Sequence, residues 1–593
     1  MSFAQLKSSR STKSFVQPSV NRYVSSASSE QSSESSLSVK KLVSNIKGAG
    51  REEGMYSELP DFVEIRQSEE TGRGIWTQSP IRAGSVIFVT KPYAAALSSP
   101  KLKSYCSCCY EPTSRNGLRR CTKCRLTHYC DSNCQTNDWV IHKHECASLQ
   151  NWSQAAPSSD YPPPSDAIRC LSRMLWKMRK QGPHARQTRE IASMQSHRSS
   201  LKPSAYETHT YLAHSLVQYL GLSSPEDMEQ YSLSSAADLV DTISRFVTNT
   251  FTVTDPTLIP LGAAVSPVVA LINHSCDPNA VVVFPRVSTD PKVQEPLMQV
   301  IAIRDIYPGE ELCSCYIFLQ AFILTSYIDA TLPTNLRQQA SNETYNFECK
   351  CHLCTSTGLD PRASLNCPKN CGGSCPLPSD EHALVRCSKC KSVVRSVEAA
   401  LDALRVGQEG LDKANNLQFE DPGKSIRLTT KLIPILTSAG FPPSAHPLLG
   451  LTRLHQQLLT SSFPNPLTQE HLDETIHTAA TNVAGLTALF REGHPVLALA
   501  LAELGKLLAV DEPSPRTTNT SVIYPPSGLP RLKLAYETLL RARKMLLIGF
   551  GVTNEGGQVG KDVREMIVAL EKEIGVFRQG VKNVLEDTPK LKA

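Results

Sequence analysis

The sequence predicts an α+β protein in which two strand-rich regions flank a cysteine-rich module and a helical insertion, followed by a long α-helical region. Three observations favour this fold class. Residues 61–97 and 249–330 contain runs of alternating apolar and polar residues separated by glycine-containing turns, which is typical of β-strands. Residues 106–146 are dense in paired cysteines. From about residue 395 onward, apolar residues recur at helical spacing.

The bulk composition is that of a globular protein. The chain has 593 residues, 20 cysteines and a formal net charge of +6, with 40% hydrophobic and 20% charged residues. No apolar run approaches the roughly 20 residues that cross a bilayer, and the start of the chain lacks the apolar core of a secretion signal. We therefore expect no membrane contact. In an intracellular chain, cysteines in tight pairs indicate zinc sites rather than disulfides.

The first 56 residues are rich in serine and basic residues and poor in apolar residues, so we expect a disordered tail. The first 29 residues carry four basic residues and no acidic residue, which also fits a mitochondrial presequence. We favour the flexible tail over the presequence.

The rest of the chain divides into seven segments by local pattern. They are strands at 57–105, the cysteine-rich module at 106–146, a linker and helical insertion at 147–248, further strands at 249–340, a short cysteine motif at 341–360, a second cysteine-rich segment at 361–394, and helix pairs at 395–593. The helix pairs are those of a helical-repeat (TPR-like) domain, although their period is not regular.

The module at 106–146 has ligands for two tetrahedral zinc ions. Its soft ligands are Cys106, Cys109, Cys121, Cys124, Cys130, Cys134, His142 and Cys146. A segment this short has no sizeable core, so bound metal must supply its folding free energy, about 10–16 kcal/mol for a structural zinc.

This ligand order resembles the MYND zinc module. The resemblance implies that the sites interleave, with Cys106, Cys109, Cys130 and Cys134 on one zinc and Cys121, Cys124, His142 and Cys146 on the other. The family's His-x3-Cys spacing favours His142 over His144. MYND modules bind proline-containing peptides, which implies protein partners. Basic residues in the block leave DNA contact as a weaker hypothesis.

Further motifs lie on both sides of the cysteine-rich module. In chain order they are Gly72-Arg73-Gly74 before it and, after it, "NHSC" at 273–276, "GEE" at 309–311, "SYID" at 326–329 and "FECKCHLC" at 347–354. Together with the cysteine-rich module they resemble the SET and MYND (SMYD) family of protein lysine methyltransferases over about residues 57–395. The resemblance implies a mostly-β SET fold with the MYND module and helices inserted into it.

The resemblance also implies a binding site for S-adenosylmethionine. Glycines suit a close backbone approach to this cofactor. The implied cofactor residues are Gly72, Arg73, Gly74, Asn249, Asn273, His274, Tyr327 and Phe347. Three cysteines in the C-terminal motif are one ligand short of a zinc site, and the family takes the fourth from "NHSC". The implied post-SET zinc ligands are Cys276, Cys349, Cys351 and Cys354.

In the family, aromatic residues line the lysine channel, and we expect Phe347, Tyr345 and a catalytic tyrosine in this role. Tyr316 and Tyr327 are both available. The family pattern "SY-x-D" followed by proline fits Tyr327, so we interpret residues 312–322 as an eleven-residue insertion that contains Tyr316. Such an insertion could disable the enzyme in this form.

A looser group of cysteines, Cys367, Cys371, Cys375, Cys387 and Cys390, could hold a fourth zinc or consist of plain thiols. The sequence predicts methyl transfer from S-adenosylmethionine to a lysine of a histone or another protein. The alternative is a catalytically inactive adaptor that recruits partners through the MYND module. We expect the nucleus, the cytoplasm or both as the location.

Overall fold

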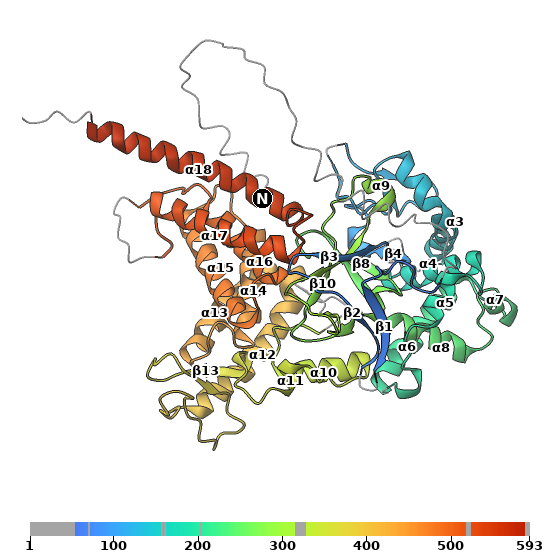
Figure 1. Cartoon of the computed structure of the whole chain (residues 1–593), viewed down its shortest axis with the longest axis horizontal. Helices are drawn as coiled ribbons and strands as arrows, with labels where there is room; N and C mark the ends of the chain where they lie inside the picture. The colour runs from blue at the N-terminus through green and yellow to red at the C-terminus, as the bar shows by residue number, and fades with distance from the viewer. Residues whose placement is uncertain are drawn as a thin grey trace, which may run out of the picture.

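The computed structural model describes residues 54–68, 71–114, 116–155, 158, 162–201, 203–314, 328–516 and 524–586. Nearly all of the predicted N-terminal tail lies outside these residues, as do Tyr316, Tyr327 and most of the predicted insertion. In the described parts, small sheets lie beside two helical layers (Figure 1). This arrangement confirms the predicted α+β class.

The sheets join two stretches of chain that are far apart in sequence. A hairpin is formed by β1 (Val63–Ser68) and β2 (Gly72–Thr77). A five-stranded sheet has the order β3 (Val86–Thr90), β11 (Met298–Ala302), β10 (Ala280–Val283), β12 (Cys313–Ser314) and β9 (Asn273–His274). A three-stranded sheet has the order β4 (Ala94–Leu97), β8 (Pro260–Val265) and β7 (Thr250–Thr254). Everything between β4 and β7 is therefore inserted between strands of one sheet.

Strands β10 and β11 are almost wholly apolar because both of their faces are covered. Ala280, Val300 and Ala302 face the core between the sheets. Val281 and Ile301, one position along, pack into the core of the C-terminal helices. Because successive strand residues point to opposite faces, both sets of positions are apolar, and the buried exception, Gln299, accepts a hydrogen bond from Asn554.

The insertion holds the cysteine-rich module and a group of helices. Its elements are β5 (Arg119–Arg120), β6 (His128–Tyr129), α3 (Ser132–Gln154), α4 (Asp166–Gln181), α5 (Arg186–Ala192), α6 (Pro203–Leu220), α7 (Pro225–Glu229) and α8 (Ala236–Thr248). Asp131 begins α3 by accepting a hydrogen bond from the Cys134 amide at 3.0 Å. Helix α4 packs against β4 and β8 and so joins the insertion to the sheets.

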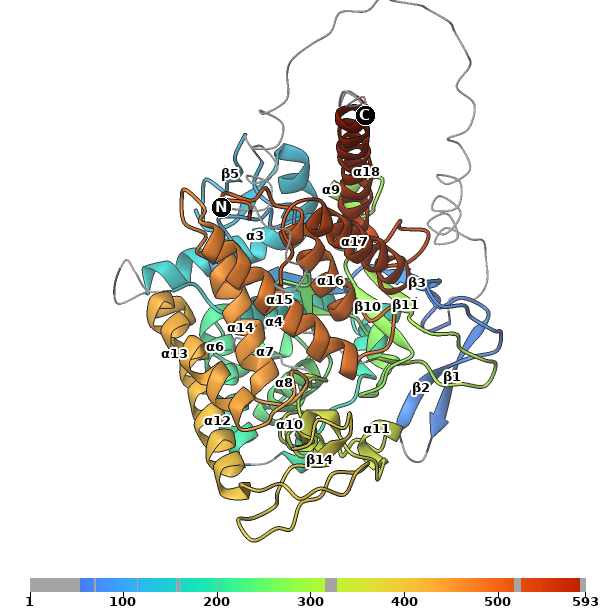
Figure 2. The same ribbon diagram turned by 90° about the vertical axis from the view of Figure 1, so that its left-hand side faces the viewer.

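The chain after β12 is mostly helical. It contains α10 (Thr334–Tyr345), α11 (His352–Thr355), the pair β13 (Ser364–Asn366) and β14 (Ser374–Pro376), and the helices α12 (Val397–Glu420), α13 (Pro422–Ser438), α14 (Leu448–Ser461), α15 (Gln469–Leu489), α16 (Pro495–Leu508), α17 (Leu529–Gly549) and α18 (Gly557–Glu586). From α12 onward each helix packs against the next (Figure 2). Among the described helices, none is both long and apolar enough to cross a bilayer.

The C-terminal helices are fixed to the sheets by hydrogen bonds as well as by apolar contacts. The Val552 amide donates to the Gly84 carbonyl at 2.9 Å. The buried Asn554 side chain donates to Gln299 Oε1 on β11 at 2.6 Å. The sheets and these helices therefore share one interface rather than a flexible linker.

Candidate functional site

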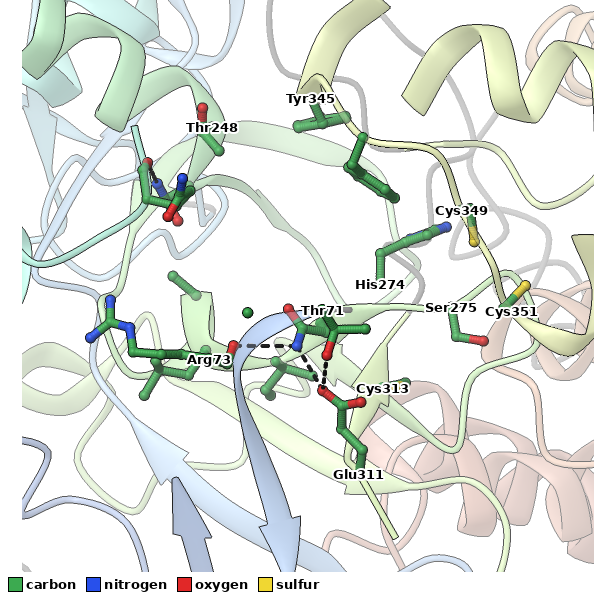
Figure 3. A pocket seen from close by; sticks show the side chains of 18 of the residues that line it. Thr71, Arg73, Thr248, His274, Ser275, Glu311, Cys313, Tyr345, Cys349 and Cys351 are labelled. Carbon is green, nitrogen blue, oxygen red and sulfur yellow. Dashed lines mark hydrogen bonds between the residues drawn. The ribbon is translucent and has the colours of Figure 1, made fainter. Parts of the chain in front are cut away.

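A cavity of about 770 Å³ lies where the β1–β2 turn, β9, the start of β7 and the segment at 345–352 meet (Figure 3). Most of the residues predicted to bind a cofactor or a substrate lysine line it. These are Gly72, Arg73, Asn249, Asn273, His274, Tyr345 and Phe347. The segments that supply them are up to 275 residues apart (72 and 347), so the fold assembles the cavity from separate elements.

The glycine turn at the cavity is conformationally demanding. Gly72 has φ +74°, in the left-handed region that favours glycine. Gly74 lies behind the cavity wall, where a Cβ atom would come within 2.3 Å of Glu311 Oε1 and 2.8 Å of Asn273 Nδ2. The backbone at Gly74 therefore sits closer to these side chains than any larger residue would allow.

Asn273 is fixed by two hydrogen bonds. Its Nδ2 donates to the Arg73 carbonyl at 3.2 Å and to Glu311 Oε1 at 2.6 Å. Thr71 Oγ1 also donates to Glu311 Oε1, at 3.5 Å. Burial raises the pKa of the Glu311 carboxyl, and the Asn273 and Thr71 hydrogen bonds oppose this rise. The "NHSC" motif is thereby tied to both the glycine turn and the "GEE" motif.

His274 stands at the opposite end of β9 from this network and faces the aromatic wall. Its ring lies 5.8 Å from that of Phe347, centroid to centroid. Burial lowers the pKa of His274 to about 4, so the imidazole is neutral at pH 7. Within the described residues, its Nδ1 is buried without a hydrogen-bond partner. A buried polar nitrogen of this kind fits a site that binds a polar ligand.

Asn249 and Arg73, both predicted cofactor residues, make hydrogen bonds at the cavity that the sequence does not reveal. Asn249 Nδ2 donates to the carbonyls of Gln195 and Arg245, at 2.8 and 2.7 Å. Arg73 donates to the Ser193 carbonyl and, at 3.3 Å, to the Tyr56 hydroxyl. Both side chains therefore connect the cavity to the helical insertion.

The predicted post-SET ligands come together beside the cavity. The sulfurs of Cys276, Cys349, Cys351 and Cys354 all lie within 4.8 Å of one another. Cys276 Sγ is 3.9 Å from Cys349 Sγ and 3.6 Å from Cys354 Sγ. Four sulfurs at these separations fit a tetrahedral zinc, in which a Zn–S bond of about 2.3 Å places sulfurs about 3.8 Å apart. Such a zinc would join β9 to the wall that carries Phe347.

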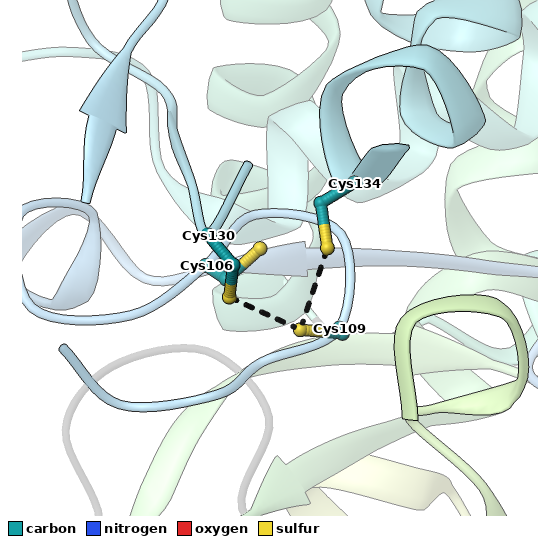
Figure 4. Close-up of side chains that lie close together, drawn as sticks. All are labelled: Cys106, Cys109, Cys130 and Cys134. Atoms are coloured by element: carbon teal, nitrogen blue, oxygen red, sulfur yellow. Dashed lines mark hydrogen bonds between the residues drawn. The ribbon is translucent and has the colours of Figure 1, made fainter. Parts of the chain in front are cut away.

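The cysteine-rich module holds two further clusters with the predicted interleaved pattern. One comprises Cys106, Cys109, Cys130 and Cys134 (Figure 4), and the other comprises Cys121, Cys124, His142 and Cys146. Cys109 Sγ lies 3.8 Å from Cys134 Sγ. His144 is outside both clusters because its ring stacks on Trp176. Both clusters have the ligand type and count of structural zinc sites.

A buried carboxylate orients the histidine of the second cluster. Glu145 Oε2 lies 3.1 Å from His142 Nδ1, which leaves Nε2 toward Cys124, 3.8 Å away. Arg169 and Arg173 of α4 both donate to Glu145. The two arginines hold the pKa of Glu145 well below its usual range despite complete burial. This pairing of carboxylate and histidine is typical of zinc sites.

Three residues of these sites were missed by sequence reasoning or given only a structural role. Glu311 appears in the sequence only as part of the "GEE" motif with no role of its own, yet it lines the cavity. Asn279 accepts from the Cys313 amide at 2.8 Å and donates to the Glu311 carbonyl at 2.7 Å. Glu145 lies three positions after His142 on one helix, and that spacing was the available signal.

The predicted insertion at 312–322 is wrong at its start. Leu312 is fully buried and donates its amide to the Ile75 carbonyl at 2.7 Å. Cys313 and Ser314 form β12, which pairs in parallel with Asn273 and His274 of β9. These three residues belong to the scaffold because they complete the sheet behind the cavity. Any surplus residues must therefore follow Ser314.

The family model described as "SET domain" matches residues 72–317, a range that includes Tyr316 but not Tyr327. "N-lysine methyltransferase SMYD2" of Rattus norvegicus is 29% identical over 293 residues, which are 49% of this chain and 59% of that protein. Its Gallus gallus counterpart is 30% identical over 305 residues, covering 51% and 62%.

The chain thus spans about three fifths of the length of these curated relatives. Among solved structures, a SET domain of LSMT bound to lysine and AdoHcy overlaps 91% of this chain and 93% of that chain. The sequence identity is 10% and the TM-score is 0.25.

Proposed function

We propose that this chain is a member of the SET and MYND (SMYD) family and an S-adenosylmethionine-dependent protein lysine N-methyltransferase. One observation carries the proposal. A single cavity brings together the glycine turn, the Asn273-His274 pair and the aromatic residues next to a four-cysteine cluster. Curated relatives that are 29% and 30% identical to this chain carry the name N-lysine methyltransferase SMYD2.

In this proposal, Gly72, Arg73, Asn249, Asn273 and His274 bind the cofactor. When bound, S-adenosylmethionine supplies an electrophilic methyl group. The Asn273 amide is already held by Glu311 and the Arg73 carbonyl, so this part of the site is ordered before any ligand enters. The buried, unpartnered His274 Nδ1 would gain a partner from the ligand.

Phe347 and Tyr345 form the wall that we propose for the substrate lysine. Their rings are 6.4 Å apart, and Tyr345 is buried. A free lysine with a pKa of about 10.4 is neutral in only about one molecule in 2,500 at pH 7. An apolar channel disfavours the charged form and so raises the fraction of neutral, nucleophilic amine. Holding this amine in line with the methyl group supplies the rest of the acceleration.

The catalytic tyrosine is either Tyr327 or Tyr316. "SYID" supports Tyr327. The strand at Cys313–Ser314 and a family match that ends at residue 317 support Tyr316 instead. With Leu312–Ser314 in the scaffold, removing residues 317–327 would leave "GEELCSCYIDATLP", which joins Tyr316 directly to Ile328 and Asp329.

We propose zinc in the two MYND clusters and the post-SET cluster, where all ligands are cysteine or histidine. The segment boundaries given by the sequence are proposed as domain boundaries. We also propose proline-containing peptides as partners of the MYND module, with DNA contact as a weaker hypothesis, and the nucleus, the cytoplasm or both as the location.

Radiolabelled methyl transfer from S-adenosylmethionine to histones and to a cell lysate tests the proposal. The chain is assayed beside two equally shortened forms, one lacking 312–322 and one lacking 317–327. Each form also carries Tyr316→Phe or Tyr327→Phe where that tyrosine is present. Tyr307→Phe is the matched control, because this side chain is 61% exposed and lies outside the cavity lining.

We expect at least one form to be active. Only one of Tyr316→Phe and Tyr327→Phe should lose activity, and Tyr307→Phe should keep it. The variant that loses activity identifies the tyrosine. If no form transfers a methyl group although calorimetry shows that the cofactor binds, the methyltransferase proposal is overturned. That result would favour a catalytically inactive adaptor that recruits partners through the MYND module.

A further inference from the structure

A fourth cysteine cluster lies outside the sites described above. The sulfurs of Cys367, Cys371, Cys387 and Cys390 all lie within 4.8 Å of one another. Cys367 Sγ is 3.4 Å from both Cys371 Sγ and Cys390 Sγ, and Cys371 Sγ is 3.6 Å from Cys387 Sγ. These separations are close to the roughly 3.8 Å expected around a tetrahedral zinc. The cluster thus has the same geometry as the MYND and post-SET clusters.

The backbone around Cys387 and Cys390 repeats a turn found in both MYND clusters. Lys391, just after the second cysteine, has φ +60° and donates its amide to the Cys387 carbonyl at 3.1 Å. Positive φ is uncommon for residues other than glycine. The Cys387 amide in turn donates to the Ser392 carbonyl at 2.9 Å.

The corresponding turns in the MYND module share this positive φ and the hydrogen bond to the carbonyl of the first cysteine. Tyr110, after Cys106-x2-Cys109, has φ +60° and donates to the Cys106 carbonyl at 2.9 Å. Arg125, after Cys121-x2-Cys124, has φ +59° and donates to the Cys121 carbonyl at 3.1 Å. Three Cys-x2-Cys pairs therefore share one strained turn that points both sulfurs to the same side.

The other half of the cluster is built for sulfur ligands as well. The Lys369 amide lies 3.3 Å from Cys367 Sγ, where it can stabilise a thiolate. A Cβ atom at Gly373 would come within 2.8 Å of Cys387 Sγ, so only glycine lets the two halves close. Cys375 is not part of the cluster; its sulfur lies 3.9 Å from the Asn366 carbonyl.

The segment that carries the cluster buries few apolar side chains. Among residues 361–394, the apolar side chains buried against the C-terminal helices are chiefly Leu365 and Val385, beside the cysteines themselves. The Asn366 amide donates to the Gly440 carbonyl, in the loop between α13 and α14, at 2.7 Å. Figures 1 and 2 show this segment at the lower end of α12.

We propose that Cys367, Cys371, Cys387 and Cys390 bind a fourth zinc ion, which holds the 361–394 segment in the conformation that packs against α12–α14. Zinc would supply folding free energy that so small an apolar core cannot. The site goes beyond methyl transfer, since none of its ligands lines the cavity.

Metal analysis of the full chain, purified without chelator and measured by inductively coupled plasma mass spectrometry, tests the proposal. We expect four zinc ions per chain, three in Cys387→Ser/Cys390→Ser, and four in Cys375→Ser. The proposal is overturned if the wild-type chain and the double variant hold the same amount of zinc. Iron in place of one zinc would overturn the metal assignment, and loss of one zinc in Cys375→Ser would overturn the ligand set.

A second measurement uses the wild-type chain and does not depend on how the variants fold. Cys390 is an exposed residue, so a free thiol there should react quickly with iodoacetamide. Bound zinc would protect it. We expect peptide mapping to show Cys390 alkylated at least tenfold more slowly before zinc removal by a chelator than after it. Equal rates before and after chelation would overturn the site.

Discussion

Asn273 donates its side-chain amide to the Glu311 carboxylate, with 2.6 Å between Nδ2 and Oε1. This contact joins the strand that carries "NHSC" to the motif that precedes β12. Because the same amide also donates to the Arg73 carbonyl, Asn273 links the glycine turn to the "GEE" motif.

Replacing Asn273 with aspartate should abolish methyl transfer. The substitution removes the donor and places a second carboxylate beside Glu311, and like charges this close disfavour each other's ionised forms. We expect kcat/KM to fall at least about 100-fold, the size of effect that a small misplacement produces. Glu311→Gln is the matched variant, because its amide oxygen still accepts from Asn273. A loss in Glu311→Gln as large as in Asn273→Asp would show that the charge of Glu311, rather than its hydrogen bond, is required.

Glu311 should also make stability depend on pH. Burial raises its pKa above the usual 4.5, so the folded state binds this proton more tightly than the unfolded state does. Stability therefore falls as pH rises from about 4.5 through the folded pKa, and it stays lower at neutral pH. Glu311→Gln lacks this penalty. We expect the melting temperature of Glu311→Gln minus that of the wild type, measured by calorimetry, to increase as the pH rises from 4.5 to 7. A constant difference across this range would contradict the prediction.

Gly74→Ala should damage the cavity, because the added methyl group would lie 2.3 Å from Glu311 Oε1 and 2.8 Å from Asn273 Nδ2. Overpacking of this kind costs about 1–3 kcal/mol, and here it also displaces the two residues that order the site. We expect at least a tenfold loss in kcat/KM. Gly575→Ala on α18 is the control, since nothing lies within 4 Å of its Cβ position and alanine favours a helix by about 1 kcal/mol. Equal effects of Gly74→Ala and Gly575→Ala would show that the close packing at Gly74 is not needed for activity.

The cysteine pairs that mark the metal clusters are visible in the sequence because the two cysteines of a pair lie close together along the chain. The resemblance to the MYND module implies that Cys121, Cys124, His142 and Cys146 share one site, and the structure brings these four residues together. The α+β class and the helix pairs could also be predicted from the sequence, because apolar periodicity is a local signal.

Contacts between distant segments could not be predicted in the same way. Glu311 meets Asn273, 38 positions away, only because β12 pairs in parallel with β9, and a two-residue strand leaves no recognisable pattern. The same short strand explains why the predicted insertion started too early. Asn279 holds β12 in place through contacts that depend on this pairing, so its role is visible only in three dimensions.

Cys276→Ser should remove one zinc and the activity together. Cys276 is the only ligand of its cluster that does not come from 349–354, so its loss frees the wall that carries Phe347. We expect one zinc fewer per chain by mass spectrometry and no measurable methyl transfer. Cys108→Ser is the control, because Cys108 belongs to no cluster in the described residues and its hydrogen bond to the Lys292 carbonyl suits a hydroxyl. Full activity of Cys276→Ser would show that the cluster does not shape the site.

Glu145→Gln should destabilise the MYND module far more than an exposed substitution of the same kind. Glu145 is fully buried between Arg169, Arg173 and His142. The neutral amide removes the carboxylate that pairs with the buried Arg169, whereas Arg173 keeps its ion pair with Asp138. Breaking a buried pair typically costs about 3–5 kcal/mol, and here it also releases the ring of a proposed zinc ligand. Glu111→Gln is the matched control, since Glu111 pairs with Arg286 at the surface, where such pairs are worth about 0–1 kcal/mol. Urea titration with zinc analysis should show a large loss of stability and a partial loss of zinc for Glu145→Gln alone. Similar curves for both variants would mean that the buried network does not hold His142 in place.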